Sequence, residues 1–257
     1  MIINPYFFVP PFDPDAQAFI TAASITNPTQ QSAINQLVVD LKGYSIWSKM
    51  KALYPFVGGT AAQHKWNLKD PRDLDAAFRL VFSGGVTHSS TGVTFNGTNG
   101  YADTKVNDFG QLNNNNKHIS MYQRNILASV SNSSMGADNL ANRFFLNFSG
   151  QNYSTLGMNQ SPFTVQTPQQ GMFAMSKTAS GSFKYFQNAL TAVTKTGSNV
   201  SSLYNYFIGA CSLNGNPFEY AAANIAFASI GDGLTDTEAA NLYTAVQAFQ
   251  TTLARQV

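Results

Sequence analysis

The chain has 257 residues, of which 44% are hydrophobic, so it is long and apolar enough for one large domain with a sizeable core. Only 11% of the residues are charged, the net charge is +2, and the lysines and arginines are scattered, which excludes the clustered positive charge of a nucleic-acid-binding protein. No stretch approaches the about 20 apolar residues of a membrane-spanning helix, so we expect no insertion into a membrane.

Residues 1–12 are rich in proline and aromatic residues and predict an extended arm. The arm lacks a basic segment followed by an apolar run, so we expect no signal peptide and synthesis in the cytoplasm. Such an arm cannot bury its aromatic rings on itself, and it must pack either on its own domain or on a partner in an assembly. The candidate assembly residues are Tyr6, Phe7, Phe8 and Phe12.

A helical section is predicted for residues 13–60. An aspartate cap predicts a short first helix that ends near residue 23. Asn27 followed by Pro28 predicts the start of a second helix, and Gly43 is placed to end it. A third, short helix is predicted over residues 45–53. The buried stripe of the second helix is predicted to consist of Ile34, Leu37, Val38 and Leu41.

Residues 61–257 predict a β-sandwich that a C-terminal helix closes. Short segments with alternating side chains are separated by polar turns, as in the strand that carries Phe144 and Leu146 on one face. Such strands are typical of an antiparallel sandwich or jelly roll, so the fold class is mainly β with helices at both ends. Turns are expected at residues 179–182 and at Asn188.

The C-terminal helix is predicted over about residues 235–253. Thr235 and Glu238 have the spacing of a capping box, in which each side chain satisfies a backbone N–H of the other residue. This assignment removes Glu238 from the candidate catalytic residues. We expect the far end of the helix to contact the N-terminal helices or another subunit. The predicted buried stripe consists of Leu242, Val246, Phe249 and Leu253.

Several stretches between residues 78 and 257 resemble the laminin-G-like, concanavalin A-like jelly roll. "VTFNGTNGYADTKV" at 93–106 resembles an early strand pair of that family, and "FKYFQNALTAV" at 183–193 resembles its strands around an Asn-centred hairpin. Asn188 is followed by Ala189, where the family usually has glycine. "YFIGACSLNGNPFEYAAANIAFASI" at 206–230 and the helix after it resemble the family's closing elements. The resemblance implies a concanavalin A-like jelly roll with a binding or structural role.

Residues 40–80 also resemble a segment that precedes such domains in structural proteins of tailed phages. The resemblance implies a non-enzymatic bacteriophage virion protein, made in the host cytoplasm and displayed as a fibre, tail or head-decoration component. Its implied partners are other virion proteins and copies of itself, and its display suits host attachment. The alternatives are a lectin-like module that binds a cell-surface glycan and, third, a glycoside hydrolase.

The residues that carry chemistry form no recognisable catalytic motif. The two glutamates, Glu219 and Glu238, lack the close spacing of the paired carboxylates of glucanases. The three histidines lack the spacing of metal ligands, and each is expected to be structural or at the surface: His64, His88 and His118. The single cysteine, Cys211, excludes an intrachain disulfide and is expected to be buried. We therefore expect neither a catalytic site nor a bound cofactor.

A glycan site needs an aromatic platform with polar side chains around it. Tyr101 with Asn99 and Asp103 offers such a group, and Trp66 is a second candidate platform. The alternative is that the tyrosine packs in the sheet while the asparagines shape turns. Loop aspartates could also supply oxygen ligands to Ca²⁺, although no EF-hand spacing supports them: Asp103, Asp108 and Asp138.

Overall fold

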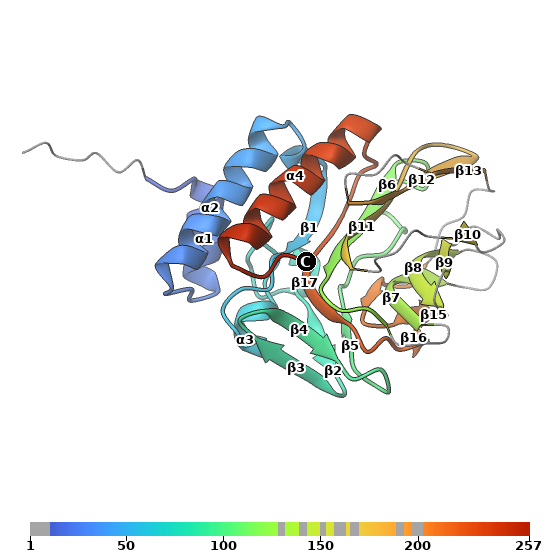
Figure 1. Ribbon diagram of the computed structural model, residues 1–257, viewed down its shortest axis with the longest axis horizontal. Coiled ribbons are helices and arrows are strands. Elements are labelled where there is room, and N and C mark those ends of the chain that lie inside the picture. Colours follow the sequence, from blue (N-terminus) through green and yellow to red (C-terminus); the bar gives the residue numbers. More distant parts are fainter. Residues whose placement is uncertain are drawn as a thin grey trace, which may run out of the picture.

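The computed structural model describes residues 11–127, 132–138, 143–149, 153–156, 163–164, 170–188, 193–196 and 203–257. These residues form three layers, in which a group of helices covers one of two stacked β-sheets (Figure 1). The predicted mainly-β sandwich with helices from both ends of the chain is therefore confirmed. No helix in this part of the chain is long and apolar enough to cross a membrane.

The first sheet is the middle layer. Its strands run in the order β13-β12-β11-β6-β17-β4-β3, and β1 also pairs with β17. The central strand β17 is buried along nearly its whole length, as its apolar sequence predicts. The strand bounds are β1 Met50–Tyr54, β3 Val86–Ser89, β4 Gly92–Phe95, β6 Lys117–Gln123, β11 Gly171–Ala179, β12 Ser182–Gln187, β13 Val193–Thr196 and β17 Asn224–Gly231.

The second sheet forms the outer layer, with the order β10-β9-β8-β7-β14-β5-β2 and with β15 paired to β7 and β16. All pairs are antiparallel except that between β15 and β7. Its strands are β2 Val81–Ser83, β5 Tyr101–Asp103, β7 Asn132–Asp138, β8 Arg143–Ser149, β9 Tyr153–Leu156, β10 Phe163–Thr164, β14 Phe207–Ile208, β15 Cys211–Leu213 and β16 Asn216–Phe218.

Two apolar cores hold the layers together. The sandwich core lies between the sheets and includes Phe144 and Leu146, the pair predicted to share a buried face. The helix-side core lies between the first sheet and the helices, where Phe227 of β17 meets the predicted stripes of both long helices. Cys211 is buried, as expected. Burial on both faces explains why the strands of the first sheet are the more apolar.

The helices begin where the capping residues predict. Asp13 caps α1 (Pro14–Ala22), and Asn27 caps α2 (Pro28–Gly43). Both helices end in a residue with positive φ that closes the last turn, at Ser24 and Ser45, so Gly43 is the last helical residue rather than the left-handed one. A short helix α3 (Ala61–His64) follows later.

The helix predicted over residues 45–53 is wrong. Only a 3₁₀ turn, Trp47–Lys49, forms there, and β1 then pairs antiparallel with β17. Leu53 of β1 enters the helix-side core, whereas Ala52 and Tyr54 enter the sandwich core. A short strand buried on both faces has the same apolar content as a buried helix, so periodicity alone could not separate them. The predicted helical section therefore contributes a strand to the sandwich.

The C-terminal helix α4 (Asp236–Thr252) has the predicted capping box. Thr235 Oγ1 accepts from the Glu238 N–H at 3.3 Å, and the Glu238 carboxylate accepts from the Thr235 N–H at 2.9 Å. The helix packs beside α2, and its last turn lies next to the start of α2 (Figure 1). The expected contact with the N-terminal helices is confirmed.

The predicted turns also form. β11 and β12 are joined at residues 179–182, and Asn188 adopts a positive φ of 51° directly after β12. The Asn188 side chain accepts from the Met172 N–H at 2.8 Å, which ties this turn to β11. In the arm, Tyr6, Phe7 and Phe8 lie outside the described residues, whereas Phe12 packs against the helix-side core of its own chain.

Candidate functional site

An aromatic and polar patch lies on the outer face of the second sheet. In β5, Ala102 points into the sandwich core, so Tyr101 and Asp103 point outward. The Tyr101 ring lies 4.8 Å from the Phe207 ring and 6.5 Å from the Tyr220 ring, measured between centroids. We call this surface the Tyr101 patch, which consists of Tyr101, Asp103, Lys105, Asn205, Phe207 and Tyr220.

The polar side of the Tyr101 patch is organised around Asp103. Its carboxylate accepts from the Lys105 backbone N–H at 2.8 Å, from Lys105 Nζ at 3.0 Å and from Asn205 Nδ2 at 3.3 Å. Asn107 Nδ2 donates in turn to Asn205 Oδ1 at 3.3 Å. Carboxylate, ammonium and amide groups therefore line one side of the aromatic group and offer both donors and acceptors.

Phe109 follows the Tyr101 patch in the chain and is exposed to solvent, although no sequence motif identified it. It lies on the loop between β5 and β6 and is 74% exposed, the largest exposure among the large hydrophobic residues that the structure describes. The Asn107 side chain accepts from the Phe109 backbone N–H at 2.9 Å, which links this loop to Asn205. The available sequence signal was a lone aromatic residue in a polar, asparagine-rich loop.

Asn99 is a predicted glycan contact, but its side chain shapes a turn. Its Oδ1 accepts from the Gly85 N–H and from Asn96 Nδ2, both at 2.9 Å. Asn96 Oδ1 accepts from three successive backbone N–H groups, those of residues 98–100. The turn interpretation therefore holds for these asparagines, although Asn99 remains exposed beside β5.

Trp66, the second predicted platform, lies in another layer. It packs against the helix-side core, and Lys65 Nζ lies 4.8 Å from the centre of its ring. The sandwich core separates that layer from the outer face of the second sheet, where Tyr101 points. The structure therefore does not bring Trp66 and Tyr101 together in one site.

The three loop aspartates proposed as Ca²⁺ ligands do not converge. Asp103 binds Lys105, whereas Asp108 is buried and binds Lys117 Nζ at 2.6 Å. Asp138 ends β7 and is also buried. Within the described ranges, no group of three His, Cys, Asp or Glu side chains is placed to hold a metal ion.

His64 and His118 are buried, whereas His88 is half-buried and meets His64. The Nδ1 atoms of His64 and His88 lie 3.0 Å apart, so one ring donates to the other. Burial, assisted by His88 and Arg255, lowers the pKa of His64 to about 3. Burial also lowers the pKa of His118, to about 4. All three imidazoles are therefore neutral at pH 7 and serve as hydrogen-bonding groups.

The two glutamates lie in different layers. Glu238 is held by its capping box and by Lys49 Nζ at 2.6 Å, at the start of α4. Glu219 follows β16 in the second sheet, with a positive φ of 51°. They do not flank a common cleft, so they cannot act as the paired carboxylates of a glycoside hydrolase.

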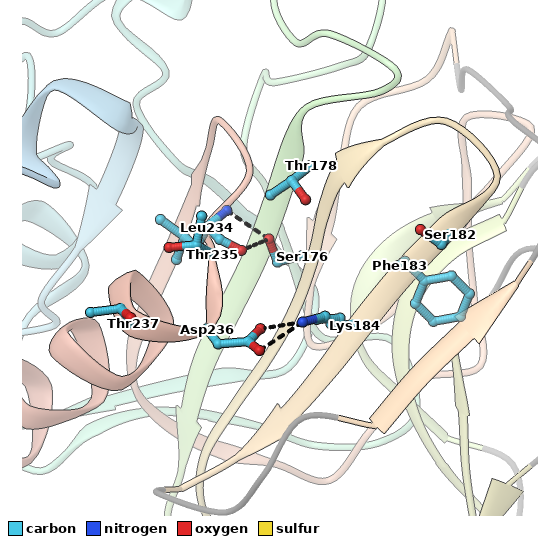
Figure 2. A pocket seen from close by; sticks show the side chains of 9 residues that line it. All are labelled: Ser176, Thr178, Ser182, Phe183, Lys184, Leu234, Thr235, Asp236 and Thr237. Carbon is cyan, nitrogen blue, oxygen red and sulfur yellow. Dashed lines mark hydrogen bonds and ion pairs between the residues drawn. The ribbon is translucent and has the colours of Figure 1, made fainter.

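A second surface feature is a polar pocket between β11, β12 and the start of α4 (Figure 2). Its cavity volume is about 320 Å³. Lys184 spans it to the Asp236 carboxylate at 2.6 Å, and Ser176 exchanges hydrogen bonds with the backbone of Leu234. The Phe183 ring belongs to the sandwich core, so the pocket offers hydroxyl groups and one ion pair but no aromatic platform.

No protein-family model matches the sequence, and no curated protein matches it. Solved structures match the fold. A Trypanosoma rangeli sialidase in complex with 2,3-difluorosialic acid aligns with a TM-score of 0.53 and 9% identity over 83% of this chain and 38% of that chain. HCR/D-Sa-GBL1/C aligns with a TM-score of 0.51 and 13% identity over 78% of this chain and 53% of that chain.

A Ruminococcus gnavus IT-sialidase CBM40 bound to α2,3-sialyllactose aligns with a TM-score of 0.37 and 14% identity over 48% of this chain and 80% of that chain. The chain spans 38% and 53% of the length of the two structures with the higher scores. At these identities the likeness concerns the fold alone. The chain therefore shares its fold with part of each of the two structures with the higher scores.

Proposed function

We propose that this protein is a non-enzymatic, lectin-like module that binds a carbohydrate through the Tyr101 patch. The observation that carries the proposal is the juxtaposition of the half-buried Tyr101 and Tyr220 rings, which are tilted to each other, with the Asp103–Lys105–Asn205 network on the outer face of the second sheet. Carbohydrate sites combine an aromatic surface with a few positioned polar groups. The apolar face of a sugar ring packs on the aromatic surface, and its hydroxyls exchange hydrogen bonds with the amide and charged groups.

Phe109 completes this surface in the proposal. An aromatic side chain that is 74% exposed gains little from the fold, so a ligand that covers it gains the burial of its apolar area. The separation of Glu219 and Glu238 supports a binding role without hydrolysis. The Phe183 ring that Figure 2 shows at the polar pocket is only 2% exposed, so this pocket is the weaker candidate surface.

A glycan array with purified protein tests the proposal. Because the Trypanosoma rangeli sialidase was solved with 2,3-difluorosialic acid, the array should include sialylated oligosaccharides. We expect Phe109→Ala and Tyr101→Ala to weaken binding at least about tenfold, which corresponds to about 1.4 kcal/mol. Tyr44→Ala is the matched control, since Tyr44 is 37% exposed at the end of α2, far from the patch.

Circular dichroism must show that each variant is folded. Wild-type protein that is folded and binds no glycan on the array would remove the lectin proposal. Equal loss of binding in Tyr44→Ala would show that the effect does not belong to the Tyr101 patch.

We also propose, as the second candidate, a structural role in a bacteriophage virion, where the module would be displayed for host attachment. Its support is the resemblance of residues 40–80 to phage structural proteins and the low share of charged residues, 11%. The arm with Tyr6, Phe7 and Phe8 would then join copies of this chain or other virion proteins. Light scattering after size-exclusion chromatography should show an oligomer, and a monomer that copurifies with no virion protein would contradict this role.

A further inference from the structure

A buried charged cluster lies inside the sandwich, at the start of β6. Lys117 shares the inward face of β6 with Ile119 and Met121, which belong to the sandwich core. Lys117 Nζ lies 2.6 Å from Asp108 Oδ2, and the two side chains are only 2% and 1% exposed. Tyr206 Oη donates to the other carboxylate oxygen, Asp108 Oδ1, at 2.7 Å, and Lys117 Nζ donates to Tyr206 Oη at 3.2 Å.

Aromatic rings surround this ion pair. Lys117 Nζ lies 4.5 Å from the centre of the Phe144 ring and 6.0 Å from that of Tyr206. Lys177, opposite Lys117 in the register of β11, is also buried, so a second ammonium group lies nearby. Charges in such a place lose their hydration, which favours the neutral forms of an amine and a carboxylic acid.

We propose that Lys117 and Asp108 condense into an isopeptide bond, an amide that links the two side chains inside the sandwich.

The reaction needs no outside reagent. Proton transfer from the Lys117 ammonium to Asp108 Oδ2 gives a neutral amine and a carboxylic acid, which a low-dielectric environment favours. The amine nitrogen then attacks Asp108 Cγ and forms the C–N bond. A second proton moves from nitrogen to the departing oxygen, and the C–Oδ2 bond breaks. The products are one amide and one water, so atoms and charge balance without any oxidation or reduction.

Two features of the cluster favour this condensation over a permanent ion pair. The nitrogen and the carboxyl group are held in contact by the fold, which raises their effective concentration. Tyr206 stays protonated because burial and Asp108 raise its pKa, and its hydroxyl can stabilise the charge that develops on Oδ1 during attack. Burial also lowers the pKa of Lys117, although Asp108 acts in the opposite direction.

The bond would tie the loop that carries Phe109 to the first sheet. Asp108 and Lys117 are nine positions apart and bracket the asparagine-rich stretch at residues 113–116. Closing this ring would limit the motion of the loop and reduce the conformational freedom of the unfolded chain. The inference stands independently of the proposed carbohydrate binding.

Intact mass spectrometry of denatured wild-type protein tests the bond directly. The expected mass is one water below that of the linear sequence. Digestion with trypsin locates the loss, because trypsin does not cleave after a lysine whose side chain is acylated. We expect cleavage after Lys105 and Arg124 but not after Lys117, in a peptide that is one water lighter than its sequence. A cyclic imide at Asp108 has the same mass change but leaves the site after Lys117 cleavable.

Variants provide the matched comparisons. Lys117→Arg and Asp108→Ala should have the full mass of their sequences, whereas Lys177→Arg should still lose one water. Tyr206→Phe should lower the fraction that has condensed after a given time. Wild-type protein with its full linear mass after prolonged incubation in the folded state would overturn the proposal. A loss of one water that persists in Lys117→Arg would overturn it as well.

Discussion

Arg255, on the helix-facing side of the first sheet, and Lys117, on its sandwich-facing side, are both buried cations, yet their partners differ in kind. Arg255 donates to the carbonyl oxygens of Pro55, Phe56 and Ala226 and to Gln250 Oε1, all of which are neutral. Lys117 instead has a carboxylate, Asp108, at 2.6 Å. The planar guanidinium has five N–H donors in a fixed fork, against three on an ammonium group, and is therefore suited to several carbonyl groups at once.

The difference indicates what each cation does in the fold. Arg255 joins the end of β1, which lies about 200 positions away in the sequence, to the central strand β17 and the last turn of α4. Lys117 instead has a charged partner, Asp108, besides its neutral contact with the Tyr206 hydroxyl, and removing either charge leaves the other without its counter-ion in that pair. The helix-side cation is therefore a multiple hydrogen-bond donor between layers, whereas the sandwich cation is half of a reactive pair.

The largest expected effect is that of Arg255→Met. The substitution leaves several buried carbonyl groups without their donor, and we expect a loss of at least about 4 kcal/mol in the free energy of unfolding. Urea unfolding monitored by circular dichroism measures the loss. Arg79→Ala is the control, because Arg79 forms only partly exposed ion pairs with Asp73 and Asp75 and should change the stability far less. Equal effects of the two variants would contradict the role assigned to Arg255.

The Lys117 site should respond differently to the removal of its partner. Lys117→Met removes the ammonium group that lies 2.6 Å from the buried Asp108 carboxylate, so we expect a loss of about 3 kcal/mol in the free energy of unfolding. The double variant Lys117→Met with Asp108→Leu removes both charges and should recover most of that loss. Urea unfolding of freshly purified wild type that still has its full linear mass, of both single variants and of the double variant gives the coupling energy of the ion pair. If the losses of the two single variants simply add in the double variant, Lys117 and Asp108 are not coupled. The contrast with Arg255, which has no single partner to remove, would then be contradicted.

Acid should destabilise the protein through His118, whose contacts fix its tautomer. Nδ1 lies 2.6 Å from the Asp232 carbonyl oxygen, which can only accept, so Nδ1 carries the proton and Nε2 accepts from Ser229 Oγ at 3.0 Å. Burial lowers the pKa of His118 from its ordinary 6.5 to about 4, so the unfolded chain binds the additional proton first as the pH falls. The stabilisation is complete above pH 6.5 and is lost as the pH falls toward 4.

The expected loss from His118 across this window is about 3 kcal/mol, since each pKa unit corresponds to about 1.4 kcal/mol. His64 adds a loss of the same sign that extends to lower pH, because its pKa is lowered to about 3. The free energy of unfolding measured by urea titration at several pH values between 7 and 4 tests this. His118→Asn should show a shallower dependence on pH than the wild type, and an unchanged slope would exclude His118 as the source.

Local signals in the sequence predicted the helix starts and the turns, because each depends on residues within a few positions of one another. Asn27 and Thr235 each accept from a backbone N–H three positions away, and Asn188 itself adopts the positive φ of its turn. Strand β1 was mistaken for a helix because its partner β17 lies at the other end of the chain. Which side of the sheet each residue of β1 faces depends on that pairing.

The candidate functional residues also divide into those that local sequence identifies and those that depend on contacts between distant segments. Tyr101 and Asp103 were identified because they lie close together in one strand. Asn205 was missed because it lies 102 positions from Asp103, and Arg255 was missed because it lies 199 positions from Phe56. Trp66 was included with Tyr101 because the sequence contains no information on which layer each segment joins. Contacts made by the tertiary fold therefore decide which of the predicted side chains share a site.

The smallest expected effect concerns the start of α4, on the same side of the first sheet as Arg255. Thr235→Ala removes one half of the capping box, and we expect a loss of about 1 kcal/mol in the free energy of unfolding. Thr237→Ala is the matched control, since Thr237 is equally exposed in the first turn of the same helix and makes no capping hydrogen bond. If Arg255 rather than the cap holds α4 in place, Thr235→Ala should lower the stability without releasing the helix from the sheet. On heating, the loss of the helical circular dichroism signal should then coincide with the loss of the tertiary signal. Separate transitions would show that α4 detaches first and that the cap, not Arg255, fixes it to the sheet.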